Sequence, residues 1–280
     1  MKTSRTPNEA TVILDPAHTE LLKELDRTFS GWARADNIQE ITPSPIYEIT
    51  DLQKLDVYEN FPHLSLVATS LYADRVSAQP TNGAFIAEDM LEARFGLSMA
   101  ACYGAYLFYE NSVLGQDTAV TLANRCFRNE DKYEGLRRLA SFTMREIVAL
   151  GSFEHTQDLL ARFAERIEKF AREVSLDLTK VAASDPFFVK NGTRAVMQKL
   201  SPVKYEFRAD ELAISSVNTH RNYFGERCRI RLANGEFAFT SCVAFGLERW
   251  VAVLVDSYQG DPAAALVAVQ NAAARESMLA

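Results

Sequence analysis

Two apolar runs in the middle of the chain, Thr121–Phe127 and Phe142–Leu150, flank a strongly charged segment from Arg128 to Arg138. Apolar runs of this length that are bounded by polar residues are typical of strands. We therefore predict two antiparallel strands joined by a long polar loop. The loop is longer than an ordinary hairpin connection, and long ordered loops usually carry a function. This pair predicts a fold built around an antiparallel sheet.

Helices are expected before and after this strand pair in the sequence. Apolar residues recur at helical spacing over residues 18–33 and again over residues 156–176. The chain closes with a helix over about residues 247–258 and an alanine-rich helix after Pro262, since proline is common at a helix start. A long strand-rich stretch covers residues 203–244. These elements together predict the α+β class, with an antiparallel sheet flanked by helices.

The chain is expected to form one folded domain. Residues 1–17 are polar and contain two prolines, so we predict a flexible N-terminal arm there. The domain then covers residues 18–280, with a helical insertion at about residues 156–190. No internal repeat, low-complexity linker or heptad array interrupts it.

Composition limits the partners that this chain can have. Lys and Arg number 30 and Asp and Glu 37, so the net charge is −7 and the pI is about 5.3. An acidic chain does not hold nucleic acid through its overall field, although a small anionic ligand still fits a local basic pocket. No run approaches the roughly 18 apolar residues of a membrane span, and the N-terminus lacks a secretory apolar segment. We expect a cytoplasmic protein without a membrane partner.

Common catalytic motifs are absent from the sequence. It contains no GxGxxG, GxxxxGK[ST], HExxH or GxSxG pattern. These absences argue against a dinucleotide-binding fold, a P-loop enzyme, a zincin and a hydrolase with a nucleophile elbow. The four cysteines are too scattered for a disulfide scaffold, so we expect buried thiols or metal ligands.

A first candidate cluster surrounds the charged loop. Arg128 and Glu130 share a face if the first strand continues through them, and Phe142 opens the returning strand. A guanidinium can bind a phosphate, a carboxylate can accept a hydrogen bond from an exocyclic amine, and a ring can stack on a base. Such a face suits a nucleotide. A solvated hairpin with no ligand is the alternative that composition alone favours.

A second candidate cluster begins where the apolar stretch from Ser241 meets Gly246 and a helix. The first turn of that helix contains Arg249. A helix N-terminus favours anions, so an arginine placed there often has another partner, and a polyphosphate is a good candidate. The alternative is an ordinary surface arginine at a helix start.

In this order, the two clusters resemble the class II aminoacyl-tRNA synthetases. Phe127-Arg128-x-Glu130 with Phe142 is similar to that class's second signature motif, and Gly246-Leu247-Glu248-Arg249 to its third. The resemblance implies that Arg128 contacts the α-phosphate of ATP, Glu130 reads adenine, Phe142 stacks beneath it and Arg249 meets the γ-phosphate. The helix from His18 and the proline-containing strand up to Ile49 would then be the first motif, which forms a homodimer interface.

A narrower resemblance covers roughly residues 20–260. The chain is similar to the amino acid:[carrier protein] ligases, which are truncated relatives of the atypical, archaeal-type seryl-tRNA synthetases. The segments that carry this resemblance are Phe61–Leu64, Cys102, the FRNE run from Phe127, Phe142-x-x-Arg145-Glu146, Asp185–Phe188, Lys204–Glu206, Ser216–Gly225 and Cys242–Trp250.

The resemblance implies a metal site that no local motif announces. In these ligases a zinc ion is held by Cys, Glu and Cys, and the matching positions are Cys102, Glu146 and Cys242. Three protein ligands leave a fourth position open, as in catalytic zinc sites. The alternative is that both cysteines are small core residues, which is also what we expect of Cys126 and Cys228.

The resemblance further implies a site for the amino acid and Mg²⁺ along one strand. Ser215, Ser216 and Asn218 match the positions that line it, Glu206 is a further candidate, and His220 lies close by. A serine-rich strand with no ligand is the alternative reading.

The implied reaction has two steps. An amino acid, with glycine or alanine expected, reacts with ATP to give an aminoacyl-adenylate. The aminoacyl group is then transferred to the phosphopantetheine thiol of a carrier protein. We expect no tRNA partner, because the chain leaves no room for an added RNA-binding module and has no Lys/Arg block.

Carrier proteins are typically acidic, so a basic docking patch is expected. The candidates are Arg162, Arg166, Lys169 and Arg172 on the helix from Thr156. Two other functions remain open. One is a non-catalytic synthetase paralogue with a regulatory role, and the other is an ATP-dependent ligase that uses a small-molecule acceptor.

Overall fold

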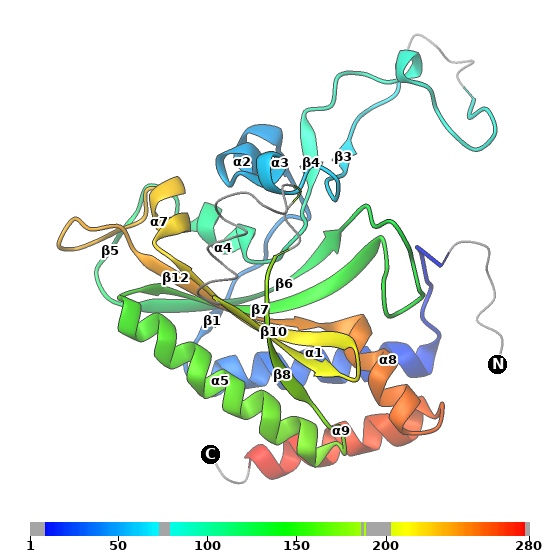
Figure 1. Cartoon of the computed structure of the whole chain (residues 1–280), viewed down its shortest axis with the longest axis vertical. Coiled ribbons are helices and arrows are strands. Elements are labelled where there is room, and N and C mark those ends of the chain that lie inside the picture. The colour runs from blue at the N-terminus through cyan, green and yellow to red at the C-terminus, as the bar shows by residue number, and fades with distance from the viewer. Residues whose placement is uncertain (1–8, 73–78, 186–187, 189–202, 278–280) are drawn as a thin grey trace.

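The computed structural model describes residues 9–72, 79–185, 188 and 203–277. Its centre is a sheet of seven strands in the order β1-β6-β7-β12-β10-β9-β8 (Figure 1). The strands are β1 (Gln39–Glu40), β6 (Thr118–Phe127), β7 (Ser141–Gly151), β8 (Thr179–Ala183), β9 (Lys204–Ala209), β10 (Leu212–Arg221) and β12 (Phe239–Gly246). Only the β1–β6 pair is parallel, and the other five pairs are antiparallel. The predicted antiparallel sheet is confirmed.

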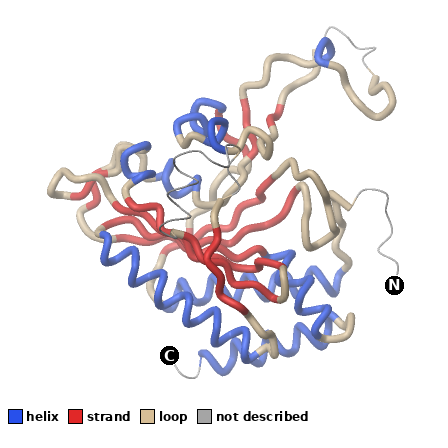
Figure 2. Tube along the Cα trace, in the orientation of Figure 1, coloured by secondary structure: helices blue, strands red, loops and turns tan. Residues whose placement is uncertain are grey.

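Four helices cover one face of this sheet (Figures 1 and 2). They are α1 (Pro16–Ala35), α5 (Phe153–Glu173), α8 (Leu247–Ser257) and α9 (Pro262–Ser277), and each matches a helix predicted from the sequence. Their apolar stripes pack on the sheet around Phe29, whose ring stacks on that of Phe245 with centroids 4.2 Å apart. Phe170 and Trp250 complete this aromatic core.

The opposite face carries smaller elements (Figure 2). The helices are α2 (Ile49–Lys54), α3 (Val57–Asn60), α4 (Tyr103–Phe108) and α7 (Tyr223–Arg227), with a 3₁₀ turn at Ala87–Asp89. The strands are β2 (Ile46–Glu48), β3 (Val67–Ala68) and β4 (Phe95–Leu97), which form a small sheet, and β5 (Val113–Leu114) and β11 (Arg231–Leu232), which pair with each other. The stretch over residues 89–113, which is strongly apolar and has no periodicity that separates helix from strand, contains β4 and α4.

Strand alternation separates the two faces. On β7, Ile147 and Ala149 belong to the core under the long helices, while Val148 and Leu150 pack on the other side. Because successive side chains point to opposite faces, Glu146 falls on the side of the small elements. The long helices thus supply stability to one face and leave the other for the site.

Two details differ from the sequence-based expectations. Residues 156–190, expected as a helical insertion, contain all of α5 except its first turn and then the edge strand β8, while residues 186–187 and 189–190 lie outside the described residues. In the predicted arm, Ala10 is buried and its carbonyl accepts a hydrogen bond from the Ala140 amide at 2.9 Å. Residues 1–8 of the arm lie outside the described part of the chain.

Among the described helices, none is both long and apolar enough to cross a lipid bilayer.

Candidate active site

A cavity of about 470 Å³ opens on the sheet face that the long helices leave uncovered. Its lining includes every site residue predicted from the sequence: Cys102, Arg128, Glu130, Phe142, Glu146, Ser215, Ser216, Asn218, Cys242 and Arg249. These residues come from β6, β7, β10, β12 and the starts of α4 and α8, or from the loops that follow them. Segments far apart in the sequence therefore meet in one pocket.

One end of the cavity holds the three predicted metal ligands. Cys102 precedes α4, Glu146 lies on β7 and Cys242 lies on β12. Within the described residues, their candidate ligand atoms all lie within 4.8 Å of one another, and all three side chains are buried. Ala244 pairs with Glu146, so Cys242 is offset from Glu146 by two residues on the same sheet face.

The Glu146 carboxylate has one satisfied oxygen and one orphaned oxygen. Oε1 accepts hydrogen bonds from the backbone amides of Ala101 and Cys102, at 2.9 and 3.1 Å. Oε2 is buried without a hydrogen-bond partner. A buried unpaired carboxylate oxygen is costly and calls for a missing partner. Two sulfurs and this oxygen are a donor set that suits zinc.

Electrostatics also favour a bound cation. A hydrogen bond with Cys102, burial and the Glu146 carboxyl all raise the pKa of the Cys242 thiol well above its usual range. Burial likewise raises the pKa of Glu146. The cluster therefore resists carrying several negative charges by itself, and a divalent cation would supply the charge that lets its members ionise.

The other end of the cavity is basic. Arg128 donates two hydrogen bonds to the Met99 carbonyl, at 3.1 and 3.2 Å, and its guanidinium lies 5.1 Å from the centre of the Phe142 ring. Arg249 donates to the carbonyls of Arg137 and Ala213, both at 2.9 Å. Carbonyl oxygens hold a guanidinium in place without neutralising its charge. The arrangement suits an anion.

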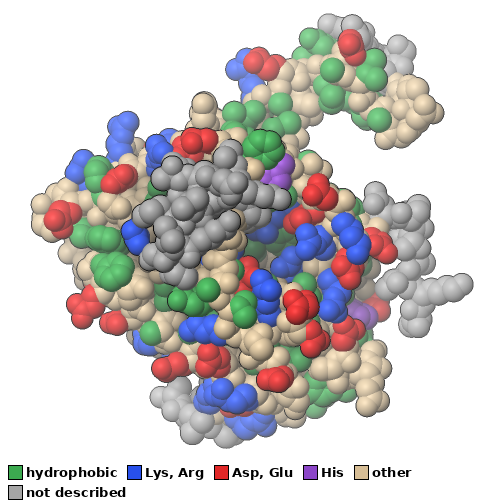
Figure 3. Space-filling model, in the orientation of Figure 1, with side chains coloured by type: hydrophobic (Ala, Val, Ile, Leu, Met, Phe, Trp, Pro, Cys, Tyr) green, Lys and Arg blue, Asp and Glu red, His purple; other side chains and the backbone are tan. Residues whose placement is uncertain are grey.

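The pKa of Arg249 reflects this surplus of positive charge. Burial, and then the charges of Arg128 and Arg138, lower its pKa to about 10. Figure 3 shows Lys and Arg side chains gathered over the loop between β6 and β7, on a chain that is acidic overall. A phosphate at this point would relieve the repulsion among the guanidinium groups.

The structure places the predicted loop residues slightly differently from the expectation. Strand β6 ends at Phe127, so Arg128 and Glu130 lie in the loop and not on the strand. Both nevertheless line the cavity. Glu130 forms an ion pair with Arg138 at 3.0 Å, a partner that the sequence did not single out.

The predicted residues of β10 divide between two environments. Asn218 donates to the Ser216 hydroxyl at 3.1 Å and to the Cys242 sulfur at 3.3 Å, so both polar groups face the metal ligands. Ser215 borders the cavity, but its hydroxyl accepts a hydrogen bond from the Trp250 indole at 3.0 Å. Alternation along the strand explains the difference.

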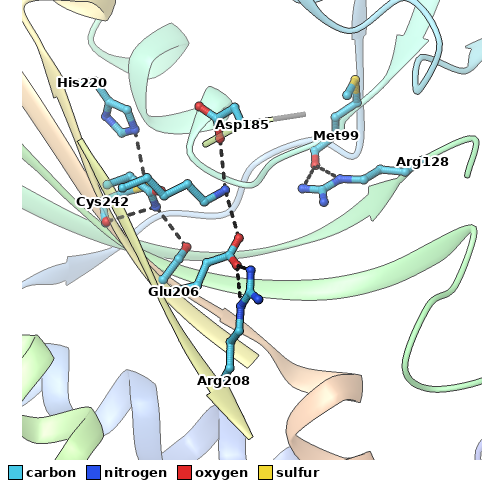
Figure 4. A network of polar contacts seen from close by, with 10 residues as sticks. Met99, Arg128, Asp185, Glu206, Arg208, His220 and Cys242 are labelled. Carbon is cyan, nitrogen blue, oxygen red and sulfur yellow. Dashed lines mark hydrogen bonds and ion pairs between the residues drawn. The ribbon is translucent and has the colours of Figure 1, made fainter. Parts of the chain in front are cut away.

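Sequence reasoning gave Glu206 as a candidate but missed the charge network around it on the floor of the cavity. Lys204 forms ion pairs with Asp185 at 3.0 Å and with Glu206 at 3.8 Å, and Glu206 pairs with Arg208 at 2.8 Å (Figure 4). Lys204 and Glu206 lie opposite Asn218 and Ser216 in the register of β9 and β10. Lys204 and Glu206 are two residues apart in the predicted strand-rich stretch, and this spacing was the only local indication that their side chains share a face.

His220 and Tyr106 also join the site. The Tyr106 hydroxyl lies 3.0 Å from His220 Nδ1. His220 Nε2 lies 3.8 Å from the Cys242 sulfur (Figure 4). Burial lowers the pKa of His220 to about 4, so its ring is neutral near pH 7.

The helix predicted to carry a basic docking patch lies on the far side of the sheet from the cavity, because α5 packs with α1 and α8. Arg166 forms an ion pair with Asp36 at 2.7 Å, and Arg162 pairs with the same carboxylate. These two arginines therefore share one carboxylate. Cys126 and Cys228 are buried in the apolar cluster, as predicted.

Comparisons with known proteins identify relatives of the chain. The chain is 32% identical over 252 residues to amino acid--[acyl-carrier-protein] ligase 2 of Bradyrhizobium diazoefficiens, covering 85% of the chain and 75% of that protein. It is 32% identical over 231 residues to ligase 1 of the same organism, covering 78% and 71%. It is also 29% identical over 178 residues to the type-2 serine--tRNA ligase of Methanocaldococcus jannaschii, which covers 58% of the chain and 34% of that enzyme.

Solved structures share the fold. The Methanopyrus kandleri seryl-tRNA synthetase, in a complex with Aquifex aeolicus tRNASec, matches with a TM-score of 0.80 at 17% identity, covering 96% of the chain and 58% of that structure. The cytoplasmic serine-tRNA ligase of Naegleria fowleri matches with a TM-score of 0.70 at 12% identity, covering 93% and 54%. No protein-family model matches the chain. The predicted class II synthetase fold is confirmed.

Proposed function

Because the chain belongs to the amino acid--[acyl-carrier-protein] ligase family, we propose that it activates a small amino acid with ATP and transfers it to the phosphopantetheine thiol of a carrier protein. The observation that carries the proposal is the cavity itself. One end of it is basic and aromatic and suits a nucleotide. The other end contains a buried Cys–Glu–Cys cluster that suits zinc.

In this proposal the basic end binds ATP together with Mg²⁺. Arg128 holds the α-phosphate, Arg249 the γ-phosphate, Phe142 stacks on adenine and Glu130 accepts a hydrogen bond from its exocyclic amine. The two guanidinium groups are already fixed by carbonyl oxygens, at 2.9 to 3.2 Å. Preorganised charges of this kind stabilise a transition state without further reorganisation.

The first step joins the amino acid to AMP. A carboxylate oxygen of the amino acid bonds to the α-phosphorus, the bond from that phosphorus to the bridging oxygen of the β-phosphate breaks, and pyrophosphate leaves. Negative charge increases on the phosphate oxygens, where Arg128 and Arg249 stabilise it. The protein contributes positioning and electrostatics, and no side chain forms a covalent bond.

The metal end would hold the amino acid. Zinc bound by Cys102, Glu146 and Cys242 would act as a Lewis acid toward the neutral amine of the substrate. The Ala101 and Cys102 amides keep the Glu146 carboxylate oriented for this role. Ser215, Ser216 and Asn218 form the neighbouring wall on β10.

Two aromatic residues at this end support a small amino acid as substrate. Tyr103 and Phe224 line the cavity beside the metal ligands, with ring centroids 6.5 Å apart. A bulky side chain would meet these rings, so we propose glycine or alanine as substrate. In the second step the phosphopantetheine sulfur bonds to the carbonyl carbon, the bond from that carbon to AMP breaks, the thiol proton passes to solvent, and a thioester forms.

The proposal includes a homodimer. Ile46 and Phe95, which share one face of the small β2-β4-β3 sheet, are 42% and 47% exposed, and such a pair of large apolar side chains needs a cover. The sheet contains the strand of the first predicted motif. A second copy of the chain would cover these side chains.

Amino-acid-dependent ATP–pyrophosphate exchange tests the activation step. We expect exchange with glycine or alanine, and a loss of about 100-fold or more in Arg249→Ala, because a preorganised charge on the phosphates is removed. Arg94→Ala is the matched control, since Arg94 is 80% exposed and outside the cavity. An undiminished exchange rate in Arg249→Ala would remove the nucleotide role of that residue.

The same assay separates the alternatives. Exchange followed by thioester formation on a phosphopantetheine-loaded carrier protein, but not on the unloaded carrier, supports the proposal. Exchange without that transfer points to a small-molecule acceptor, and absence of exchange points to a non-catalytic paralogue. Cys102→Ala should lose both metal and exchange while Cys126→Ala, also buried, keeps both.

A further inference from the structure

The Cys242 sulfur receives hydrogen-bond donors from strand β10. Asn218 Nδ2 lies 3.3 Å from the sulfur and His220 Nε2 lies 3.8 Å from it. Asn218 and His220 are two residues apart on the strand, so their side chains point to the same face, which borders the cavity. The second proton on the Asn218 amide is directed to the Ser216 hydroxyl at 3.1 Å, which fixes the orientation of the amide.

The regular pairing of the sheet ends at His220. The pairing of β10 with β12 shifts register between Thr219 and Arg221, and Arg221 has a left-handed backbone with φ of +54°. Bulges of this kind are common beside active sites. The strand thus departs from regular pairing at the residue that reaches the Cys242 sulfur (Figure 4).

Tyr106 contacts the other ring nitrogen of His220. Its hydroxyl lies 3.0 Å from Nδ1, and a hydroxyl that donates to Nδ1 leaves the ring proton on Nε2, the nitrogen nearer to the sulfur. The Tyr106 ring is held by stacking on Phe224, with centroids 4.1 Å apart and planes at 12°. Tyr106 also follows Cys102 by one helical turn. The chain of contacts therefore links the two cysteine-bearing elements.

We propose that His220 and Asn218 are positioning residues that hold the Cys242 sulfur as a hydrogen-bonded thiolate of the metal centre, with Tyr106 setting the tautomer of His220. The inference rests on the proposed metal site and extends it to residues outside the three ligands. Hydrogen bonds to a metal-bound sulfur reduce its negative charge and orient it, and such partners typically change metal affinity 10- to 100-fold.

Zinc affinity and the cobalt(II) spectrum test this role without any activity measurement. His220→Leu should weaken zinc binding about 10- to 100-fold in competition with a chromophoric chelator. It should also move the sulfur-to-cobalt charge-transfer band to longer wavelength, because the sulfur becomes a stronger electron donor. His220→Gln, which keeps a donor near the Nε2 position, should restore most of both properties.

Tyr106→Phe provides a second variant that keeps the ring stack and removes only the hydroxyl, so it reports on the chain even if His220→Leu fails to fold. It should shift the band in the same direction by a smaller amount. Tyr109→Phe removes a hydroxyl at the C-terminal end of the same helix, away from the cavity, and should leave affinity and band unchanged.

Wild-type zinc affinity and an unchanged band in His220→Leu and Tyr106→Phe would overturn this inference and leave the proposed metal site standing. A His220→Gln variant as weak as His220→Leu would also overturn it, because packing and not the donor would then matter. If the wild-type protein binds neither zinc nor cobalt, the metal site of the proposed function fails, and the inference fails with it.

Discussion

Glu248 connects the start of helix α8 to strand β7, and its removal gives a quantitative test of how the nucleotide end of the cavity is held. Its Oε2 accepts the Thr143 amide at 2.7 Å, and its Oε1 accepts the Thr143 hydroxyl at 3.0 Å and Arg125 at 2.8 Å. The pairing of β7 with β12 ends at Met144 and Gly246. The carboxylate therefore satisfies the first β7 amide beyond the ladder.

The expected loss of stability in Glu248→Ala can be worked from these contacts. The stranded Thr143 amide costs about 1–3 kcal/mol, and the pair with half-exposed Arg125 contributes at most about 1 kcal/mol. Burial raises the pKa of Glu248, so the cost of burying the charge offsets part of this gain. We expect a net loss of about 2–3 kcal/mol in the free energy of unfolding. Glu248→Gln should lose about half as much, since one acceptor oxygen remains.

Urea denaturation followed by circular dichroism measures the effect as a lower midpoint at an unchanged slope. Glu165→Ala on the exposed side of α5 is the control and should stay within about 0.5 kcal/mol of wild type. Pyrophosphate exchange should fall in Glu248→Ala as well, because Arg249 follows directly in the same turn. A stability within 0.5 kcal/mol of wild type in Glu248→Ala would refute the reasoning.

Two further predictions concern the frame of the site. Gly225→Ala should destabilise the protein by about 1–3 kcal/mol, because a Cβ there would lie 2.1 Å from the Ala238 carbonyl oxygen. Gly115→Ala is the control, since a Cβ at Gly115 would meet no atom within 4 Å, and thermal denaturation should show no change in its stability. Partial burial raises the pKa of Asp117, but hydrogen bonds from the Ser152 amide and hydroxyl, at 2.6 and 2.7 Å, outweigh it and leave that pKa below its usual value. A lowered carboxyl pKa stabilises the fold above the unfolded value and loses this effect as pH falls through the folded one. Asp117→Asn should therefore cost about 0.5–1 kcal/mol at pH 7, and denaturation curves should show the difference from wild type shrinking below about pH 4; a difference independent of pH would contradict this.

Much of the fold could be predicted because its signals are local. The helical spacing of Leu21, Leu25 and Phe29 predicted α1, and the apolar runs before Phe127 and after Phe142 predicted the β6–β7 pair. Short elements were the weak point. Strands such as β3 and β5 have two residues each, too few for any periodicity to appear.

The site could be predicted only through resemblance to a known family. Cys102, Glu146 and Cys242 show no metal-binding spacing, and Arg249 alone reads as a surface arginine at a helix start. The expected basic patch on α5 shows the limit of composition. Its charges looked available in the sequence, yet Arg166 is paired with Asp36 on the opposite side of the sheet from the cavity.

The order of residues by itself determined which segments are strands and helices, because hydrophobic periodicity acts between neighbours a few positions apart. Only the tertiary structure decided that Glu146 has an unsatisfied buried oxygen beside two sulfurs, and that His220 on β10 meets Cys242 on β12. Those properties depend on strand order, register and burial. They arise when distant segments pack together, and no local pattern contains them.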